Sequence, residues 1–286
     1  WNSSLWTADE MGKFITSYLG PTFQKENIPA KIIFGENPLW SVCMPQLKMV
    51  SSKDFTDTIL QNYPKIKSFN LIAAGHGYSL SPDIMPIQVD KKYLKTPIMP
   101  FEMAEKAQIP VWVTEISDVT PLDISIQDGL KWAVTFHNYL TKANVSAIVW
   151  WGGAMPTANN ESLIILDKNR KDFLLSKRYD ILGNFSRYIP EKSTRIQVTQ
   201  SNGVPLLISA YKKDNKYTLV TINPSGQTIQ TSLRLDGADI NGSLKQYITT
   251  EDSRWTETTI IQENKKNYNL TIPPFSVVTF VGKVRL

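Results

Sequence analysis

Four short segments constrain the fold most, because each is nearly continuous in apolar residues. They are 31–35 (KIIFG), 69–74 (FNLIAA), 111–114 (VWVT) and 146–151 (SAIVWW). Helical patterns separate them. A capping box at Thr7–Glu10 begins one helix, which we expect to end at Gly20-Pro21, and two more are expected at 54–62 and 125–142. Apolar strands that alternate with helices are typical of βα units around a parallel sheet.

The pattern changes after about Phe173 to short strands separated by turns such as Asn202-Gly203 and Pro224-Ser225-Gly226. Repeated short strands of this kind predict an all-β region that closes as a sandwich. We therefore expect two domains, 1–172 and 173–286. The expected strands of the second are 204–211, 217–223, 228–235, 244–250 and 276–281.

Composition argues against several classes of protein. The net charge is +5, but no run of basic residues exceeds two, so we expect no nucleic-acid partner. Cys43 is the single cysteine, which rules out an intrachain disulfide. With two histidines and no ligand cluster at zinc spacing we expect no metal and no cofactor. No apolar run reaches about 18 residues, so no membrane span is expected.

Asn-X-Ser/Thr triplets are numerous in the chain, which begins with Trp1. In a eukaryotic secretory pathway they would be glycosylation acceptors, and they favour a secreted protein. The alternative is chance in a chain rich in Asn and Ser. The triplets begin at Asn2, Asn144, Asn160, Asn184, Asn241 and Asn269.

Polar and aromatic side chains gather at the ends of the four predicted strands. Glu36 follows the first, His76 and Tyr78 the second, Glu115 the third, and Trp150 ends the fourth. The carboxyl ends of parallel strands meet at one edge of a sheet, where active sites of α/β barrels lie. Carboxylates and aromatic rings together suit a sugar, which offers apolar faces for stacking and hydroxyls for hydrogen bonding.

Glu115 is the strongest catalytic candidate, because burying an unpaired charge at the end of an apolar strand is costly without a partner or solvent. Glycoside hydrolysis uses two carboxyl groups, about 5–5.5 Å apart when one attacks the anomeric carbon and about 6.5–9.5 Å apart when water intervenes. Glu115 suits the attacking role. The alternative is a carboxylate held in a salt bridge at the sheet rim.

The order of these segments resembles the C-terminal portion of glycoside hydrolase family 30 over nearly the whole chain. The matching stretches are Leu5-Trp6-Thr7, Lys31–Glu36, Gly75-His76-Gly77-Tyr78, Trp112-Val113-Thr114-Glu115, Val149-Trp150-Trp151 and, most distinctive, 177–189 (KRYDILGNFSRYI). The resemblance implies an α/β partial TIM barrel, strands 5–8 of a (β/α)8 barrel, followed by an all-β sandwich-like domain.

The resemblance also implies the roles of the carboxylates. The seventh-strand Glu, the nucleophile, falls on Glu115, and the general acid/base belongs to an Asn-Glu-Pro motif at the fourth strand. This chain has no such motif, and its expected position lies just upstream of Trp1. Glu36-Asn37-Pro38 follows the wrong strand, so Glu36 is read as a subsite or support residue. On this basis we expect a truncated sequence that is inactive alone.

Four further residues are candidates for substrate binding, each with a structural alternative. His76 hydrogen-bonds a sugar hydroxyl, holds Glu115, or is satisfied by the backbone in a tight loop, and Tyr78 has the same alternatives. Trp150 is a stacking platform or a core residue, with Trp151 pointing the other way. Trp6 lines the cleft or packs on its own helix as a hydrophobic staple. A long segment, 79–108, is expected to pass over the mouth of the cleft.

The expected function is that of part of a secreted, retaining β-glycosidase, an endo-glycanase and a monomer when complete. It would hydrolyse cell-wall polysaccharide such as xylan or β-1,6-galactan or glucan by double displacement. Family members that cut glucuronic-acid-decorated xylan carry Arg and Tyr after the eighth strand, where this chain has 152–157 (GGAMPT). The alternatives are a non-catalytic carbohydrate-binding remnant and a glucosylceramidase-like hydrolase.

Overall fold

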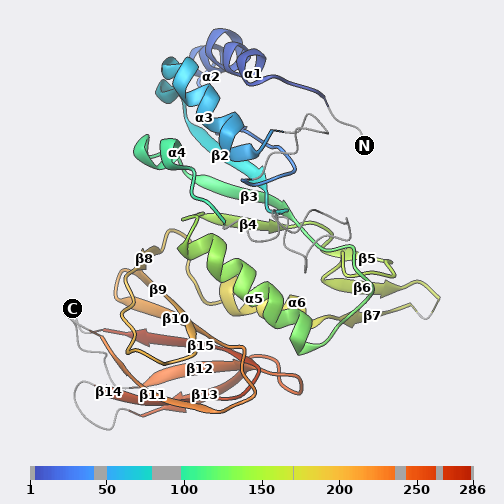
Figure 1. The fold of residues 1–286 in the computed structure, drawn as a ribbon, viewed down its shortest axis with the longest axis vertical. Coiled ribbons are helices and arrows are strands. Elements are labelled where there is room, and N and C mark those ends of the chain that lie inside the picture. Colours follow the sequence, from blue (N-terminus) through green and yellow to red (C-terminus); the bar gives the residue numbers. More distant parts are fainter. Residues whose placement is uncertain are drawn as a thin grey trace. The chain divides into compact units, whose positions relative to one another are not determined.

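The computed structural model describes residues 4–41, 50–78, 98–169, 171–235, 243–261 and 267–284. Contacts divide the chain into two compact units (Figure 1). Unit 1 comprises Trp1–Thr120 and Asn138–Gly152, and unit 2 comprises Pro121–His137 and Gly153–Leu286. The division into two domains, 1–172 and 173–286, stays a prediction.

Unit 1 contains a four-stranded sheet in the order β1-β2-β3-β4, and all neighbouring pairs are parallel. The predicted parallel sheet is therefore confirmed. Glu115 lies within β3, whereas the sequence placed it just beyond the strand. The strands are β1 (Ile32–Phe34), β2 (Leu71–His76), β3 (Val111–Ile116) and β4 (Ala147–Trp150).

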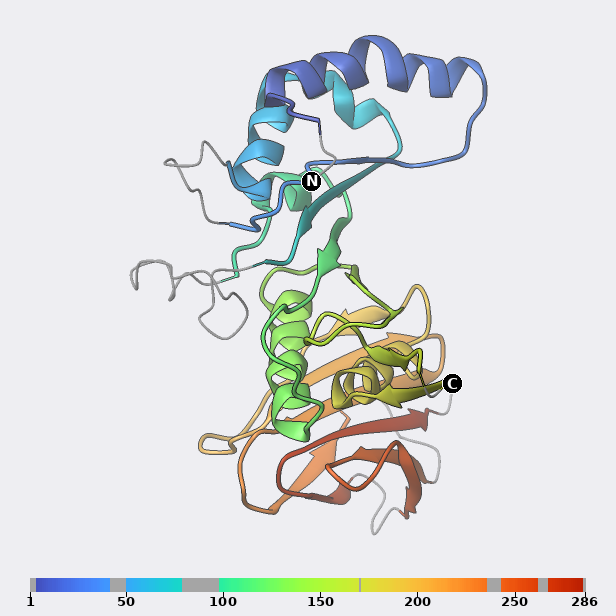
Figure 2. The ribbon, with the colours of Figure 1, turned by 90° about the vertical axis from the view of Figure 1, so that its right-hand side faces the viewer.

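Helices cover this sheet: α3 packs on β2, and α1 packs on α3 (Figure 2). The capping box at Thr7 is confirmed, since Thr7 accepts from the Glu10 backbone and Glu10 accepts from the Thr7 backbone. The helical segments are α1 (Ala8–Phe14), the π-helical η1 (Ile15–Leu19), α2 (Gly20–Lys25), α3 (Ser52–Asn62), η3 (Pro64–Ser68), α4 (Glu102–Lys106) and α5 (Ile126–Thr141), whose residues fall in both units.

The prediction that the first helix ends at Gly20-Pro21 is wrong. The π-helical turn Ile15–Leu19 changes the hydrogen-bonding pattern just before Pro21, which then occupies the first turn of α2, where proline is tolerated. Gly20 is needed for packing, because a Cβ there would lie 2.5 Å from the ring of Phe69. The Gly-Pro pair therefore marks a change of helix type.

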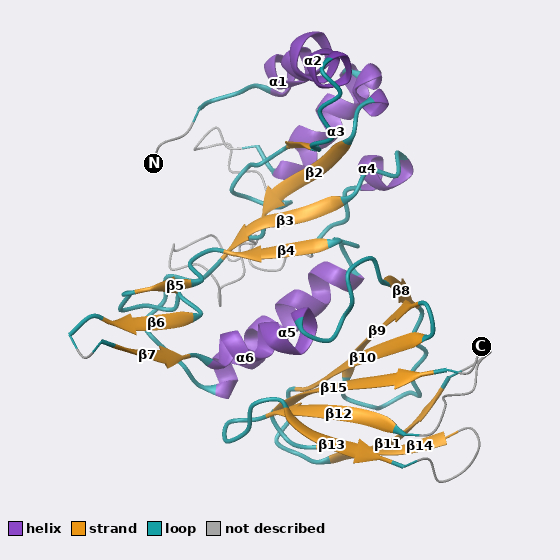
Figure 3. Ribbon diagram, turned by 180° about the vertical axis from the view of Figure 1, so that it is seen from behind, coloured by secondary structure: helices purple, strands orange, loops and turns teal. Residues whose placement is uncertain are grey.

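Unit 2 is rich in β-structure (Figure 3). Its largest sheet has the order β13-β12-β15-β10-β9-β8, a pair β11-β14 is antiparallel, and β5-β6-β7 form a third sheet. The strands are β5 (Ala154–Met155), β6 (Ile164–Asp167), β7 (Asp172–Leu175), β8 (Thr194–Ile196), β9 (Leu207–Lys213), β10 (Lys216–Asn223), β11 (Ile229–Arg234), β12 (Leu244–Thr249), β13 (Thr256–Ile260), β14 (Asn267–Ile272) and β15 (Ser276–Lys283).

One apolar cluster joins the six-stranded sheet to the β11-β14 pair. Leu244, Val278 and Phe280 come from the larger sheet, and Leu270 and Ile272 from β14. Full burial of such side chains stabilises a fold by about 1.5–3 kcal/mol each relative to exposure. The five strands expected from sequence are present within a few residues of their predicted bounds, whereas β5–β8, β13 and β14 were not predicted.

Helix α6 (Lys177–Ser186) occupies the distinctive run 177–189 and packs on β12 and β15. Arg178 is fully buried, and its Nη1 donates to Oδ2 of Asp128 on α5 at 2.5 Å. Nη1 and Nη2 also donate to the carbonyls of Asp123 and Ser162. Helix α6 therefore turns charged residues inward. Because its buried face is partly polar, the spacing of apolar residues alone does not predict this helix.

Burial bears on the Asn-X-Ser/Thr triplets. Asn184 is fully buried, accepts from the Thr249 hydroxyl at 2.7 Å and donates to the Thr279 hydroxyl at 3.2 Å. Asn160 is buried as well and accepts from the backbone of Asp123. These two triplets are not accessible in the folded chain. Asn2 and Asn241 lie outside the described residues.

Candidate active site

The carboxyl end of β1 brings Glu36 over the neighbouring strand. Gly35 has φ 110°, and a Cβ there would lie 2.3 Å from the carbonyl oxygen of Ala74 on β2, so only glycine fits. Glu36 itself has φ 30°, in the left-handed region that side chains rarely adopt. Such backbone strain persists where the surrounding structure enforces it, and it often marks functional sites.

A bulge in the pairing of β2 with β3 sets the direction of Glu115. Gly75 pairs with Val113, but His76 pairs with Glu115, so Thr114 is an extra residue on β3. Bulges of this kind re-aim side chains next to active sites. Paired residues share a face of the sheet, and His76 and Glu115 therefore point to the same side.

Glu115 has two described partners at the end of its side chain. The hydroxyl of Tyr78 donates to Oε1 of Glu115 at 2.8 Å. Nδ1 of His76 lies 3.4 Å from the same oxygen, an ion-pair contact when the ring is protonated. Glu115 is 26% exposed, so it is partly open to solvent. These contacts place His76 and Tyr78 beside Glu115, and their role in substrate binding stays a prediction.

His76 lies between two carboxylates. Its Nε2 is 3.4 Å from Oε2 of Glu36, on the opposite side of the ring from Glu115. The ring of Tyr78 meets that of His76 edge to face, with centroids 5.8 Å apart. The hydroxyl of Ser117, two residues beyond Glu115, lies 3.3 Å from the Tyr78 hydroxyl. Ser117 was not predicted, and nothing in its local sequence marks it.

Backbone contacts fix the loop that carries His76 and Tyr78. The His76 amide donates to the carbonyl of Asn37, and the Gly77 amide donates to the carbonyl of Glu115 at 2.7 Å. Tyr139 donates its hydroxyl to the carbonyl of Gly77 at 2.8 Å. A Cβ at Gly77 would lie 2.8 Å from the side chain of Val113, so glycine is required for this close approach.

Trp150, the last residue of β4, and Trp151, which follows it, lie on opposite faces by strand alternation. Ile116 pairs with Trp150, so Trp150 shares the face of the fully buried Ile116. Trp112 pairs with Ala74 on β2 and with Ala147 on β4, so these three residues share a face. Every second residue of a strand lies on the same face, which puts His76 with Ala74 and Trp151 with Ala147. His76 and Trp151 therefore lie on one face of the sheet. Trp151 is 50% exposed. The role of Trp150 as a stacking platform stays a prediction, and the register favours Trp151.

Trp6 contacts the helix that follows it. Its ring centroid lies 5.5 Å from that of Phe14, and the indole is 43% exposed. This contact agrees with a staple-like role, one turn further along than the usual position. A role for Trp6 in the cleft stays a prediction. Of the predicted segment 79–108, residues 79–97 lie outside the described residues.

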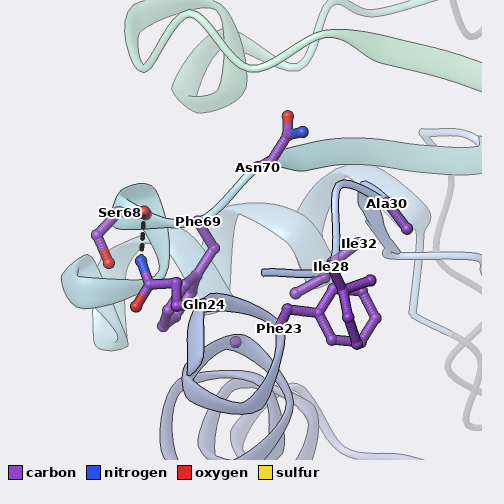
Figure 4. Close-up of a pocket in the computed structure, with 9 residues that line it drawn as sticks. Phe23, Gln24, Ile28, Ala30, Ile32, Ser68, Phe69 and Asn70 are labelled. Carbon is purple, nitrogen blue, oxygen red and sulfur yellow. Dashed lines mark hydrogen bonds between the residues drawn. The ribbon is translucent and has the colours of Figure 1, made fainter. Parts of the chain in front are cut away.

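A pocket of about 230 Å³ lies at the other end of the strands (Figure 4). Ile32 at the start of β1 and Asn70 just before β2 line it, together with Phe23 and Ile28. Gln24 donates to the carbonyl of Ser68 at its rim. The pocket is mainly apolar and is separated from Glu115 by the length of the strands, so we assign it no part in the site.

Among the residues that the structure describes, no group of three or more His, Cys, Asp and Glu side chains could hold a metal ion. Within the same ranges, no helix is long and apolar enough to cross a membrane.

Comparisons with known proteins complement this geometry. No protein-family model matches the chain. It is 26% identical over 180 residues to the glucuronoxylanase XynC of Bacillus subtilis, an alignment that covers 60% of this chain and 39% of the relative. The chain thus spans well under half the length of that relative.

Solved structures share the fold. The family 30 subfamily 8 xylanase Xyn30A of Clostridium acetobutylicum matches 99% of this chain and 62% of its own, with a TM-score of 0.74 and 21% identity. The catalytic domain of the family 30 xylanase C of Talaromyces cellulolyticus matches 98% of this chain and 58% of its own, with a TM-score of 0.75 and 19% identity.

A parallel sheet joined to a β-rich region is thus a fold that this chain shares with solved glycoside hydrolases. Within that class, the resemblance to glycoside hydrolase family 30 is confirmed by similarity of both sequence and structure.

Proposed function

We propose that this chain is part of a retaining β-glycosidase that hydrolyses a cell-wall polysaccharide, with Glu115 as the nucleophile. The observation that carries the proposal is the position of Glu115 at the carboxyl end of β3, with the Tyr78 hydroxyl 2.8 Å from its Oε1. The proposal includes the assignment of β1–β4 as strands 5–8 of a (β/α)8 barrel and of the β-rich region as a sandwich-like domain.

The contacts of Glu115 suggest which oxygen attacks. Tyr78 and His76 both reach Oε1, and among the described residues no side chain makes a hydrogen bond or ion pair with Oε2. Oε2 therefore forms the bond to the anomeric carbon while the glycosidic bond breaks, and a general acid protonates the leaving oxygen. The same residue then takes a proton from water, which attacks the anomeric carbon and releases Glu115.

The general acid is the second part of the proposal. The resemblance places it in an Asn-Glu-Pro motif on the strand that precedes the matched segment, and the 286 residues contain no such motif. We propose that residues preceding Trp1 supply it. General acid catalysis is typically worth about 10²–10⁴-fold in rate. The 286 residues alone are then a very poor catalyst.

The substrate class follows from the relatives and from one difference. The relative named glucuronoxylanase indicates a xylan backbone. The Arg and Tyr that hold a glucuronate in such family members are not found in residues 152–157 (GGAMPT). Undecorated xylan, or a β-1,6-linked galactan or glucan, is therefore the proposed substrate. Secretion and a monomeric complete protein belong to the same proposal.

Reducing-sugar release by the complete protein, with its upstream sequence appended, tests this function. Glu115→Gln keeps the shape of the side chain but removes the nucleophile, while Glu26→Gln changes a surface carboxylate paired with Lys25 and is the matched control. The substrates are xylan, glucuronoxylan, β-1,6-galactan, β-1,6-glucan and glucosylceramide. We expect the control to retain activity, and proton NMR to show the β-anomer as the first product.

Two outcomes would contradict the proposal. Equal sugar release by the parent and Glu115→Gln would remove Glu115 as the nucleophile. No release by either, with polysaccharide still bound in a pull-down, would favour a non-catalytic carbohydrate-binding protein. Turnover of glucosylceramide alone would select the glucosylceramidase-like alternative.

A further inference from the structure

We infer that Glu36 is a positioning residue, which holds the His76 ring against the carboxylate of Glu115. The inference rests on the proposed role of Glu115 as nucleophile. The carboxylates of Glu36 and Glu115 lie at opposite nitrogens of one ring, Nε2 and Nδ1, each at 3.4 Å. Both are ion-pair contacts, and both are longer than ordinary N–H···O hydrogen bonds of about 2.7–3.2 Å.

The protonation pattern of the ring decides what it presents to Glu115. A neutral imidazole has one N–H, whereas a protonated ring donates from both nitrogens. A neutral ring that donated to Glu36 would turn the lone pair of Nδ1 toward Oε1 of Glu115. A protonated ring satisfies both carboxylates. Contacts at both nitrogens therefore fix the orientation of the His76 ring between the two carboxylates.

The need for Glu36 is greatest after the first chemical step. When Oε2 of Glu115 bonds to the sugar, the negative charge of that carboxylate is lost, and Oε1 becomes the carbonyl oxygen of an ester. The His76 ring then has Glu36 as its remaining carboxylate partner, at 3.4 Å from Nε2. Glu36 thus holds the ring in the same orientation toward Oε1 through the covalent intermediate.

The backbone holds Glu36 in the required place. Its φ of 30° follows the φ of 110° at Gly35, so the strand end adopts two successive left-handed residues. The next residue, Asn37, accepts from the His76 amide at 3.0 Å and from the hydroxyl of Ser52 at 2.7 Å. The turn after β1 thus contacts His76 twice, through the carbonyl of Asn37 and the carboxylate of Glu36. A surface carboxylate without a role would not need such a turn.

Nitrogen-15 NMR of the histidine rings tests the contact in the 286-residue chain, without any need for activity. The chain has only two histidines, and His76→Gln assigns the signals by removing one set. We expect Glu36→Gln to move the ring signals of His76 and to leave those of His137 unchanged. Glu26→Gln, the control, should move neither set. Unmoved His76 signals in Glu36→Gln would overturn the inference.

Kinetics of the complete protein test the consequence. The Glu36 side chain is 40% exposed, and a partly exposed ion pair is worth at most about fivefold in an equilibrium or rate, so kcat of Glu36→Gln should fall by about two- to fivefold while KM stays the same. Glu36→Asp should recover part of kcat. An unchanged kcat in Glu36→Gln would overturn the positioning role. If Glu115→Gln is fully active the proposed function fails instead, and the NMR result still decides whether Glu36 holds His76.

Discussion

Removal of the carboxylate of Asp128 should strongly destabilise unit 2. Arg178 is fully buried and donates to Asp128, and the Asp128 side chain is 3% exposed. Loss of one partner leaves an uncompensated buried charge, which costs about 3–5 kcal/mol. The remaining acceptors of Arg178, the carbonyls of Asp123 and Ser162, are neutral and do not replace the charge.

Asp128→Ala is the perturbation, and Lys131→Met is its matched control. Lys131 pairs with the same carboxylate at 3.0 Å but is partly exposed, so its loss should cost no more than about 1 kcal/mol. For Asp128→Ala, a loss of 3–5 kcal/mol corresponds to a fall in Tm of about 6–20 °C. Urea unfolding measures the free energies of both variants and thermal unfolding their Tm values, each followed by circular dichroism and tryptophan fluorescence.

The double variant Asp128→Leu with Arg178→Met separates charge burial from packing. Replacement of a buried ion pair by apolar residues of similar volume is often neutral or stabilising, so the double variant should recover most of the loss. The reasoning is refuted if Asp128→Ala lies within about 1 kcal/mol of Lys131→Met, since the two differ by at least 2 kcal/mol on this account.

Three further predictions concern single residues. Gly35→Ala should cost about 1–3 kcal/mol of unfolding free energy in urea, because φ is 110°; a loss below 0.5 kcal/mol would contradict the required left-handed backbone. Tyr78→Phe should lower kcat of the complete protein about tenfold, since Glu115 loses a donor but stays partly hydrated; kinetics unchanged from the parent would argue against this contact. The hydrogen bond from the Ser125 hydroxyl holds the pKa of Asp123 below its usual value of 3.8, so its stabilisation is present above pH 3.8 and lost as the pH falls through the lowered value. Urea midpoints of Asp123→Asn and the parent should converge in that acid range, and a constant difference from pH 6 to pH 2 would contradict it.

The sequence predicted well what is encoded locally. Runs such as 69–74 and 111–114 are apolar on both faces, so they identify buried parallel strands without knowledge of their neighbours. Because parallel strands end at one edge of the sheet, the sequence alone predicts that His76, Tyr78 and Glu115 lie close together. Their common position is a property of topology, which the alternation of strands and helices determines.

The parts that the sequence did not predict depend on contacts between distant segments. The bulge that pairs His76 with Glu115 is set by the register of two strands. The inward charge of Arg178 depends on Asp128, fifty positions earlier, so the run 177–189 resembles a polar connection rather than a helix that packs on β12 and β15. Glu36 showed its relation to His76 only when the left-handed turn after β1 was known.

The extra residue at Thr114 has a consequence for variation and engineering. If the two strands paired without the bulge, Thr114 would stand opposite His76, and the carboxylate of Glu115 would turn toward the packed side of the sheet. Substitutions in this strand can change its packing by degrees, but loss of the bulge at unchanged length reverses the face on which Glu115 lies. A designer who grafts this strand onto another scaffold must therefore conserve the bulge as strictly as the glutamate.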